Sequence, residues 1–126
     1  MVSWVIAMGL SMEAMRVHHL AFRTRDLTRL ERFYTDALGL SVARRDSERS
    51  VWLRAGGTIL MLEQAEGEEP GVPPGARELV AFGIEAPDVD RWRRVLAANG
   101  IDVEDETAFT LYFRDPDGRR IALSHY

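Results

Sequence analysis

The stretch DPDGRRIALSHY (115–126) carries the clearest local evidence about the fold. DPDG is typical of a tight turn, because Asp folds back on its own backbone, Pro fixes φ and Gly supplies a positive φ. RRIAL then has the character of a strand that leaves this turn. Within it the small residue Ala122 separates two branched apolar residues, where an alternating strand would carry a polar side chain. The position is either simply packed or lacks a functional group.

The turn closes the second of two similar halves of the chain. HLAFRTRDLTRLERFYTDALGLSV (19–42) has the same pattern as LVAFGIEAPDVDRWRRVLAANGIDV (79–103): a β-prone run, an Asp, an amphipathic segment, a Gly and a further β-prone run. His19 is matched by Leu79, and Gly57 by Gly118. Such self-similarity indicates two copies of one supersecondary unit.

Each half is predicted to contain one helix. Asp26 and Asp88 are placed to cap the N-termini, and Gly39 and Gly100 to end the helices in a left-handed conformation. Between cap and glycine, apolar residues recur at helical spacing and form one stripe on each helix. The stripes are Leu27, Leu30, Phe33, Ala37 and Leu38 in the first helix, and Val89, Trp92, Val95 and Leu96 in the second.

Three β-prone runs follow each helix, so each half reads as βαβββ. The runs are 40–46, 50–55 and 58–64, then 101–105, 108–114 and 119–125. The predicted modules, 16–65 and 77–126, are joined by the Pro-, Gly- and Glu-rich linker EGEEPGVPPGA (66–76). Because either module alone is small for a stable core, we expect one α+β domain, 16–126, with a shared core.

Composition excludes several classes of function. The chain has 126 residues, a net charge of −4 and no Cys, so we expect no nucleic-acid partner, no disulfide and no thiolate metal site. WVIAMGL (4–10) is too short to cross a bilayer and lacks the basic flank of a secretory signal. We therefore expect a cytoplasmic protein without a membrane partner. Residues 1–15 are expected to form an N-terminal arm. It is flexible, forms an extra strand or results from an assigned start codon that lies upstream of the true one.

Strand alternation assigns side chains to two faces. His18, Leu20 and Phe22 are expected under a helix, which leaves His19 on an open face; Ile121 and Leu123 are expected under the helices. If the two modules form one curved sheet, its open side is a cup. The side chains predicted to line that cup are His19, Met61, Glu63, Leu79, Ala122 and Tyr126. Trp52, Phe109 and Phe113 either line the cup or fill the core.

HHLAFRTRDLTRLERFYTDALGL, GGTILMLE and DPDGRRIAL together resemble the vicinal oxygen chelate superfamily, over residues 16–126. Glyoxalase I, bleomycin- and fosfomycin-resistance proteins and extradiol dioxygenases are members. The resemblance implies paired βαβββ modules that form a cupped mixed sheet with helices outside, commonly in a homodimer. It also implies, in the catalytic branches, a divalent metal held at four positions, which correspond here to His19, Met61, Leu79 and Ala122.

Only His19 matches the residues that the resemblance implies for a metal, since divalent metals require oxygen or nitrogen ligands there. A metal held by His19 and the nearby Glu63 is the remaining metal alternative. The leading hypothesis is a small-molecule-binding protein, similar to the bleomycin-resistance branch, that holds an apolar or aromatic compound without a metal cofactor. The alternative is a lyase, isomerase or dioxygenase relative that uses His19 and Glu63 with a metal or as an acid–base pair. A dimer without a ligand is a third reading.

Overall fold

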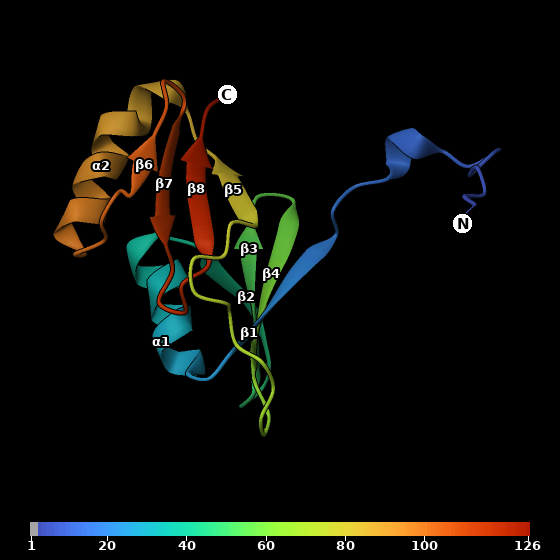
Figure 1. The fold of residues 1–126 in the computed structure, drawn as a ribbon, viewed down its shortest axis with the longest axis horizontal. Helices are drawn as coiled ribbons and strands as arrows, with labels where there is room; N and C mark the ends of the chain where they lie inside the picture. Colours follow the sequence, from blue (N-terminus) through green and yellow to red (C-terminus); the bar gives the residue numbers. More distant parts are fainter. Residues whose placement is uncertain (1–2) are drawn as a thin grey trace.

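The computed structural model describes residues 3–126, in which two four-stranded mixed sheets carry the fold (Figure 1). In the first sheet the strand order is β1-β4-β3-β2, and in the second it is β5-β8-β7-β6. β1 runs parallel to β4 and β5 parallel to β8, whereas the other pairs are antiparallel. The bounds are β1 (His19–Thr24), β2 (Ser41–Ser47), β3 (Ser50–Ala55), β4 (Thr58–Gln64), β5 (Leu79–Gly83), β6 (Asp105–Glu106), β7 (Thr110–Arg114) and β8 (Arg120–Ser124). The prediction of two βαβββ modules in an α+β fold is confirmed.

The first helix begins as predicted but changes its geometry halfway. α1 (Leu27–Arg32) starts at Asp26, whose side chain accepts a hydrogen bond from the backbone amide of Arg29. The chain then continues as a π-helical turn (Phe33–Ala37) and ends at Gly39, where φ is +80°. A π turn holds more residues than an α turn, so it rotates the side chains that follow. Tyr34, which the predicted stripe omits, is fully buried, whereas Phe33 is half-buried.

The second helix departs from the sequence prediction at its start. A 3-10 turn (Ala86–Asp88) precedes α2 (Val89–Ala98), and the Asp88 side chain makes no capping hydrogen bond. The capping prediction for Asp88 was wrong, because its backbone is helical (φ −92°, ψ −1°) and not in the extended conformation that aims a capping side chain at the first amides.

The predicted strand 101–105 is also largely wrong, since only Asp105–Glu106 pairs with a neighbour. Ile101 and Val103 still pack against the core, while Asp102 and Glu104 are exposed. This stretch therefore contributes apolar contacts as a loop before β6.

One hydrophobic core joins the two modules, which confirms the predicted shared core. α1 and the π turn bring Leu30 and Tyr34 to it, and the second module brings Leu96 and Phe113. All of these are at most 1% exposed. The first helical segment also contributes Leu27 and Leu38. The inner faces of the sheets contribute Phe22, Val51, Leu53, Leu60, Leu62, Leu111, Ile121 and Leu123.

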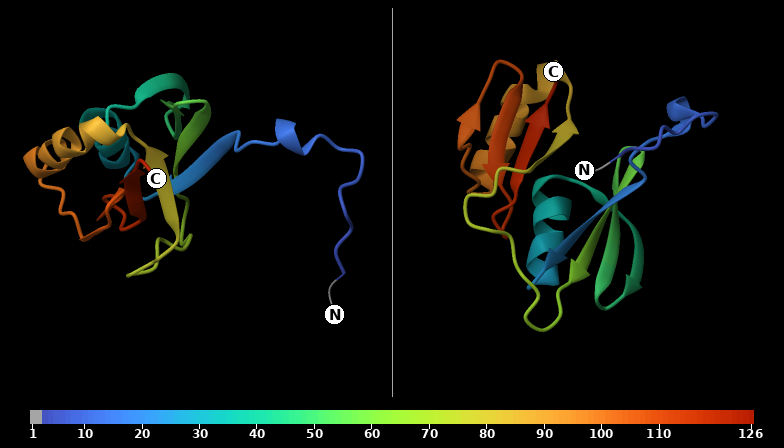
Figure 2. Two further views of the ribbon diagram at one scale, coloured as in Figure 1. Left: turned by 90° about the horizontal axis from the view of Figure 1, so that it is seen from above. Right: turned by 45° about the vertical axis from the view of Figure 1, so that its right-hand side comes forward.

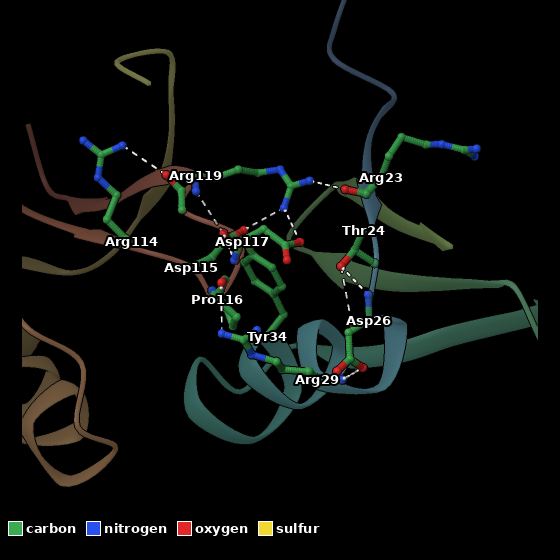
Figure 3. Close-up of polar contacts among 11 residues, drawn as sticks. Arg23, Thr24, Asp26, Arg29, Tyr34, Arg114, Asp115, Pro116, Asp117 and Arg119 are labelled. Atoms are coloured by element: carbon green, nitrogen blue, oxygen red, sulfur yellow. Dashed lines mark hydrogen bonds and ion pairs between the residues drawn. The ribbon is translucent and has the colours of Figure 1, made fainter. Parts of the chain in front are cut away.

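The DPDG turn locks the second module onto the first (Figure 3). The Asp115 side chain is fully buried and accepts hydrogen bonds from the Tyr34 hydroxyl (2.7 Å) and from the Arg119 guanidinium (3.0 Å). Arg119 also donates to the backbone carbonyl of Arg23, and its guanidinium lies 4.5 Å from the ring centre of Phe22. The DPDG turn before β8 is thus the polar joint between the modules.

Two segments lie outside the modules. The linker contains no strand and is fastened by Glu69, which accepts two hydrogen bonds from Arg23 at 2.8 Å. Residues 3–15 extend away from both sheets (Figures 1 and 2), and their one regular element is a 3-10 turn (Met12–Ala14). Within residues 3–126, no helix has the length and apolar character that a bilayer span requires.

Candidate functional site

The open face of the first sheet carries three of the predicted site residues. Strand β1 pairs with β4 so that Ala21 lies opposite Met61, and β3 places Trp52 on the other side of Met61. The alternate residues of β3 and β4, including Leu53 and Leu60, are completely buried in the core. Met61 and Trp52 therefore point to the uncovered side, together with His19 and Glu63. The structure places His19, Met61 and Glu63 on one face.

His19 and Glu63 share this face but are far apart along it. His19 is opposite Ile59, whereas Glu63 is opposite Arg23, four positions further along both strands. At about 3.3 Å per residue, that offset separates the two backbone positions by about 13 Å. Each side chain has another neighbour: Glu63 lies 3.8 Å from the Arg23 guanidinium, and the Nδ1 atoms of His19 and His18 are 3.1 Å apart. The structure does not bring the proposed acid–base pair together.

His18 is not where alternation placed it. It is exposed and precedes β1, which begins only at His19. The helix-covered face of β1 therefore begins two residues after His18, with half-buried Leu20 and then buried Phe22.

The open face of the second sheet carries Leu79 and Ala122. Leu79 lies opposite Arg120, and Ala122 lies between Ala81 and Tyr112. Leu79 is 41% exposed, whereas Ala122 is completely buried although it points to the open side. The guanidinium of Arg120 lies 4.3 Å from the ring centre of Tyr112, the residue directly across from Ala122. The slot at Ala122 is therefore closed over within the sheet.

Tyr126 stands apart from this face. It follows the last residue of β8, is 99% exposed, and packs edge-on against Phe109 with 5.3 Å between ring centres. The structure thus does not bring it to the other predicted site residues.

The two open faces belong to separate sheets. β1 is an edge strand of one sheet and β5 is an edge strand of the other, and no strand pairing joins them in the described residues. His19 and Met61 therefore share one face within this chain, and Leu79 and Ala122 share another.

Each open face presents an aromatic ring with a guanidinium beside it. Trp52 has the Arg44 guanidinium 5.3 Å from its ring centre, and its indole N–H is buried without a hydrogen-bond partner in the described chain. Tyr112 has Arg120 in the same role. Sequence reasoning left the phase of Trp52 open and did not single out Arg120. Val51 and Leu53 are apolar residues at alternate positions of β3. Their spacing was the signal that would have placed Trp52 on the opposite face.

A groove of about 560 Å³ lies where the linker passes the start of β5 and β8. We call this groove the linker groove. Its linker side is apolar and is formed by Val72, Pro73 and Ala76. Its other side combines Leu79 with Arg119 and Arg120. The remaining lining residues are Phe22, Arg77, Glu78, Val80 and Ile121.

Sequence comparison decides the family. The profile described as the Glyoxalase/Bleomycin resistance protein/Dioxygenase superfamily matches residues 16–123, which covers the first module, the linker and nearly all of the second module. The chain belongs to this superfamily. The match begins after the extended arm and ends inside the last strand, so it coincides with the two βαβββ modules of the structure.

Two relatives are similar over most of the chain. The chain is 30% identical over 122 residues to the metallothiol transferase FosB of Staphylococcus epidermidis, with 89% of this chain and 82% of the relative covered. It is also 30% identical over 122 residues to a virulence protein of Salmonella typhimurium, with 88% and 84% covered. Among solved structures, a glyoxalase/dioxygenase from Nostoc punctiforme superposes with a TM-score of 0.77 at 26% identity, covering 98% of this chain and 97% of the other.

The residues present do not fit the metal centre that the superfamily resemblance implies. Of the four implied positions, Met61, Leu79 and Ala122 offer no oxygen or nitrogen ligand, and Ala122 is completely buried. Within residues 3–126, no three His, Asp or Glu side chains lie close enough together to hold a metal ion. A divalent cation needs several such donors, so His19 alone does not make a site of the superfamily type.

Proposed function

We propose that this chain binds a small apolar or aromatic molecule on its open faces, without the metal centre of the catalytic branches. The observation that carries the proposal is which side chains stand at the four implied metal-ligand positions. The scaffold is complete, but three of the four positions that would hold the metal are occupied by Met61, Leu79 and Ala122. A surface with these side chains favours apolar contact over ion coordination.

Aromatic stacking would supply much of the binding energy. Trp52 lies beside Met61 on the first open face, where a polarizable thioether and a large ring offer good packing to a flat ligand. Its unpaired, buried indole N–H is a donor that a ligand acceptor could satisfy after a small displacement of the ring. Trp52 is therefore the residue on which the proposal is tested.

We further propose that a second copy of the chain completes the cup. β1 and β5 are edge strands, and unpaired strand edges favour pairing with another strand. Pairing β1 of one chain with β5 of another would bring the face of His19 and Met61 next to the face of Leu79 and Arg120. The prediction of a homodimer thus gains a physical reason, namely that a cup joining both faces needs two chains.

The enzymatic alternative has less support. Its metal form needs donors that the open faces do not supply, and its acid–base form needs His19 and Glu63 to reach one substrate atom although they lie about 13 Å apart along the strands. FosB is named as a transferase, but its similarity to this chain does not carry that activity across the substituted ligand positions.

Calorimetric titration with a neutral aromatic probe, naphthalene-2-carboxamide, tests the binding proposal in buffer containing EDTA. We expect the wild-type protein to bind the probe and Trp52→Ala to bind it at least tenfold more weakly, since both burial and stacking are lost. Phe109→Ala is the control, because Phe109 is an aromatic residue of the second module, 44% exposed, that packs against Tyr126 and not against Trp52.

Two results would overturn the proposal. Equal binding by the wild-type protein and Trp52→Ala, or no binding by the wild-type protein, would remove the aromatic site. Stoichiometric micromolar binding of Mn, Ni, Zn or Fe that His19→Ala abolishes would show that a metal centre forms after all. Sedimentation equilibrium of the wild-type protein tests the second copy, and a monomer at the ligand-binding concentration would exclude the shared cup.

A further inference from the structure

We propose that Arg120 is the anchor for an anionic group of the ligand, so that a guanidinium supplies the positive charge that a metal supplies in the catalytic branches. This inference rests on the proposed function, because it names the class of ligand that the same surface takes. Arg120 lies two residues before Ala122 on β8, hence on the same open face and about 7 Å along the strand. The charge is therefore close to the position whose metal ligand is absent.

Arg120 has bonding capacity that the protein leaves unused. Its side chain is only 12% exposed, and its one ion-pair partner within residues 3–126 is Asp105, at 3.8 Å. Asp105 is itself 64% exposed, so water weakens that pair. The Nε atom of Arg120 is buried without a hydrogen-bond partner in the described chain. An unsatisfied buried donor is costly, and a bound anion that accepts its hydrogen bond is one way in which the cost is removed.

The neighbouring arginines show that this is not a general property of the region. Arg119 binds Asp115 and Asp117 at 3.0 and 3.1 Å and also donates to a backbone carbonyl. Arg114 binds Glu104 at 2.5 Å and donates to the carbonyls of Ala76 and Gly118. Both arginines are fully engaged in holding the turn and the linker. Within residues 3–126, Arg120 alone of the three has no carboxylate within hydrogen-bond distance, since Asp105 is 3.8 Å away.

The surroundings of Arg120 fix its orientation and leave room for a ligand. Its guanidinium lies over the Tyr112 ring at 4.3 Å, which restricts the plane of the fork before any ligand arrives. The side chain also lines the linker groove, whose volume of about 560 Å³ is within the range of small-molecule sites. Leu79, directly opposite Arg120, and Val72 on the linker supply apolar contact for the body of the ligand.

The chemistry of the guanidinium limits the anion. Arginine binds planar or tetrahedral oxyanions through two parallel N–H···O bonds, so carboxylates, phosphonates and phosphates all fit. We therefore infer a small molecule with an apolar or aromatic body and one such oxyanion. The oxyanion would face Arg120, and the body would lie against Leu79 and the linker groove.

Matched ligand pairs test this inference separately from the proposed function. Naphthalene-2-carboxylate is compared with naphthalene-2-carboxamide, and phenylphosphonate with benzamide, by calorimetry in EDTA. We expect the wild-type protein to prefer at least one anion over its neutral counterpart by about tenfold, the value of one charge-assisted hydrogen bond. Arg120→Gln should lose that preference and keep its affinity for the neutral probe. Arg120→Lys should retain part of it.

The control is Arg91→Gln, which removes an equal charge from the outer side of α2, where Arg91 is 76% exposed. It should leave the preference unchanged. Equal binding of anion and neutral probe by the wild-type protein would refute the inference while leaving the proposed function intact. A preference that persists in Arg120→Gln would assign the anion to another residue and also refute it. If neither kind of probe binds, the proposed function fails and the inference fails with it. A carboxylate preference without a phosphonate preference, or the reverse, identifies the anion.

Discussion

Removing the Asp115 carboxylate should weaken the joint between the modules more than any surface charge change. The fully buried side chain accepts hydrogen bonds from the Tyr34 hydroxyl and the Arg119 guanidinium, and from the backbone amides of Asp117 (2.9 Å) and Arg119 (3.0 Å). In Asp115→Ala these donors lose their acceptor inside the protein. Breaking a buried charge pair by removing one partner costs about 3 to 5 kcal/mol. That is a large part of the roughly 5 to 15 kcal/mol by which a small domain is stable.

Urea unfolding followed by circular dichroism measures this loss as a change in the free energy of unfolding. Tyr34→Phe removes a single hydrogen bond to a charged acceptor and should cost about 1.5 kcal/mol, which keeps the test open if Asp115→Ala does not fold. Asp90→Ala is the control, because Asp90 is 85% exposed and its pair with Arg93 spans 3.6 Å; its effect should be within about 0.5 kcal/mol. The reasoning is refuted if Asp115→Ala costs less than about 1 kcal/mol, or if the effects of Tyr34→Phe and Asp115→Asn simply add.

Three further predictions concern Tyr34, Glu69 and Gly100. Burial and the neighbouring Asp115 raise the pKa of Tyr34 well above its usual 10.0, so the folded state keeps a proton that the unfolded state loses. Stability should therefore fall as pH rises past 10, and absorbance at alkaline pH should show one of the three tyrosines ionising only on unfolding. The Arg23 hydrogen bonds lower the pKa of Glu69 from 4.5 to about 2. The stability difference between wild type and Glu69→Gln should thus be complete above pH 4.5 and lost as pH falls through about 2, as urea unfolding at each pH would show. Gly100→Ala should lower the free energy of unfolding by about 1 kcal/mol, because φ is +68° at Gly100. Gly83→Ala, at a strand position without a positive φ, should not lower it by this amount. Equal melting temperatures of the two variants would contradict this prediction.

The sequence predicted the architecture because its strongest signals are local and occur twice. Asp26 and Gly39 mark the ends of the first helical segment, and alternation along β4 and β8 correctly separated the buried residues Leu60 and Ile121 from the open face. These assignments depend on side-chain period and turn chemistry, which act over a few residues.

Features that depend on distant partners were missed. Tyr34 lies outside the regular apolar stripe, and its place in the core is tied to Asp115, a residue 81 positions away. The loop at 101–105 has strand-like apolar residues, but only its last residue, Asp105, pairs with β7, opposite Tyr112. Neither outcome can be read from a period of two or of 3.6, because tertiary contacts decide both.

The same limit explains why the site was only partly predicted. Alternation identified which side chains share a face, and so assigned Met61 and Ala122 to the open faces, although Ala122 is completely buried there. It carried no information on how far apart His19 and Glu63 lie, since that depends on the register between β1 and β4. It also could not show that Arg120 lies on Tyr112 and that its Nε has no hydrogen-bond partner within residues 3–126, because both facts depend on tertiary contacts. The family resemblance alone directs attention to Ala122, where it implies a metal ligand and the sequence has none. The role proposed for the neighbouring Arg120 emerges only when the hydrogen bonds of Arg114, Arg119 and Arg120 are compared.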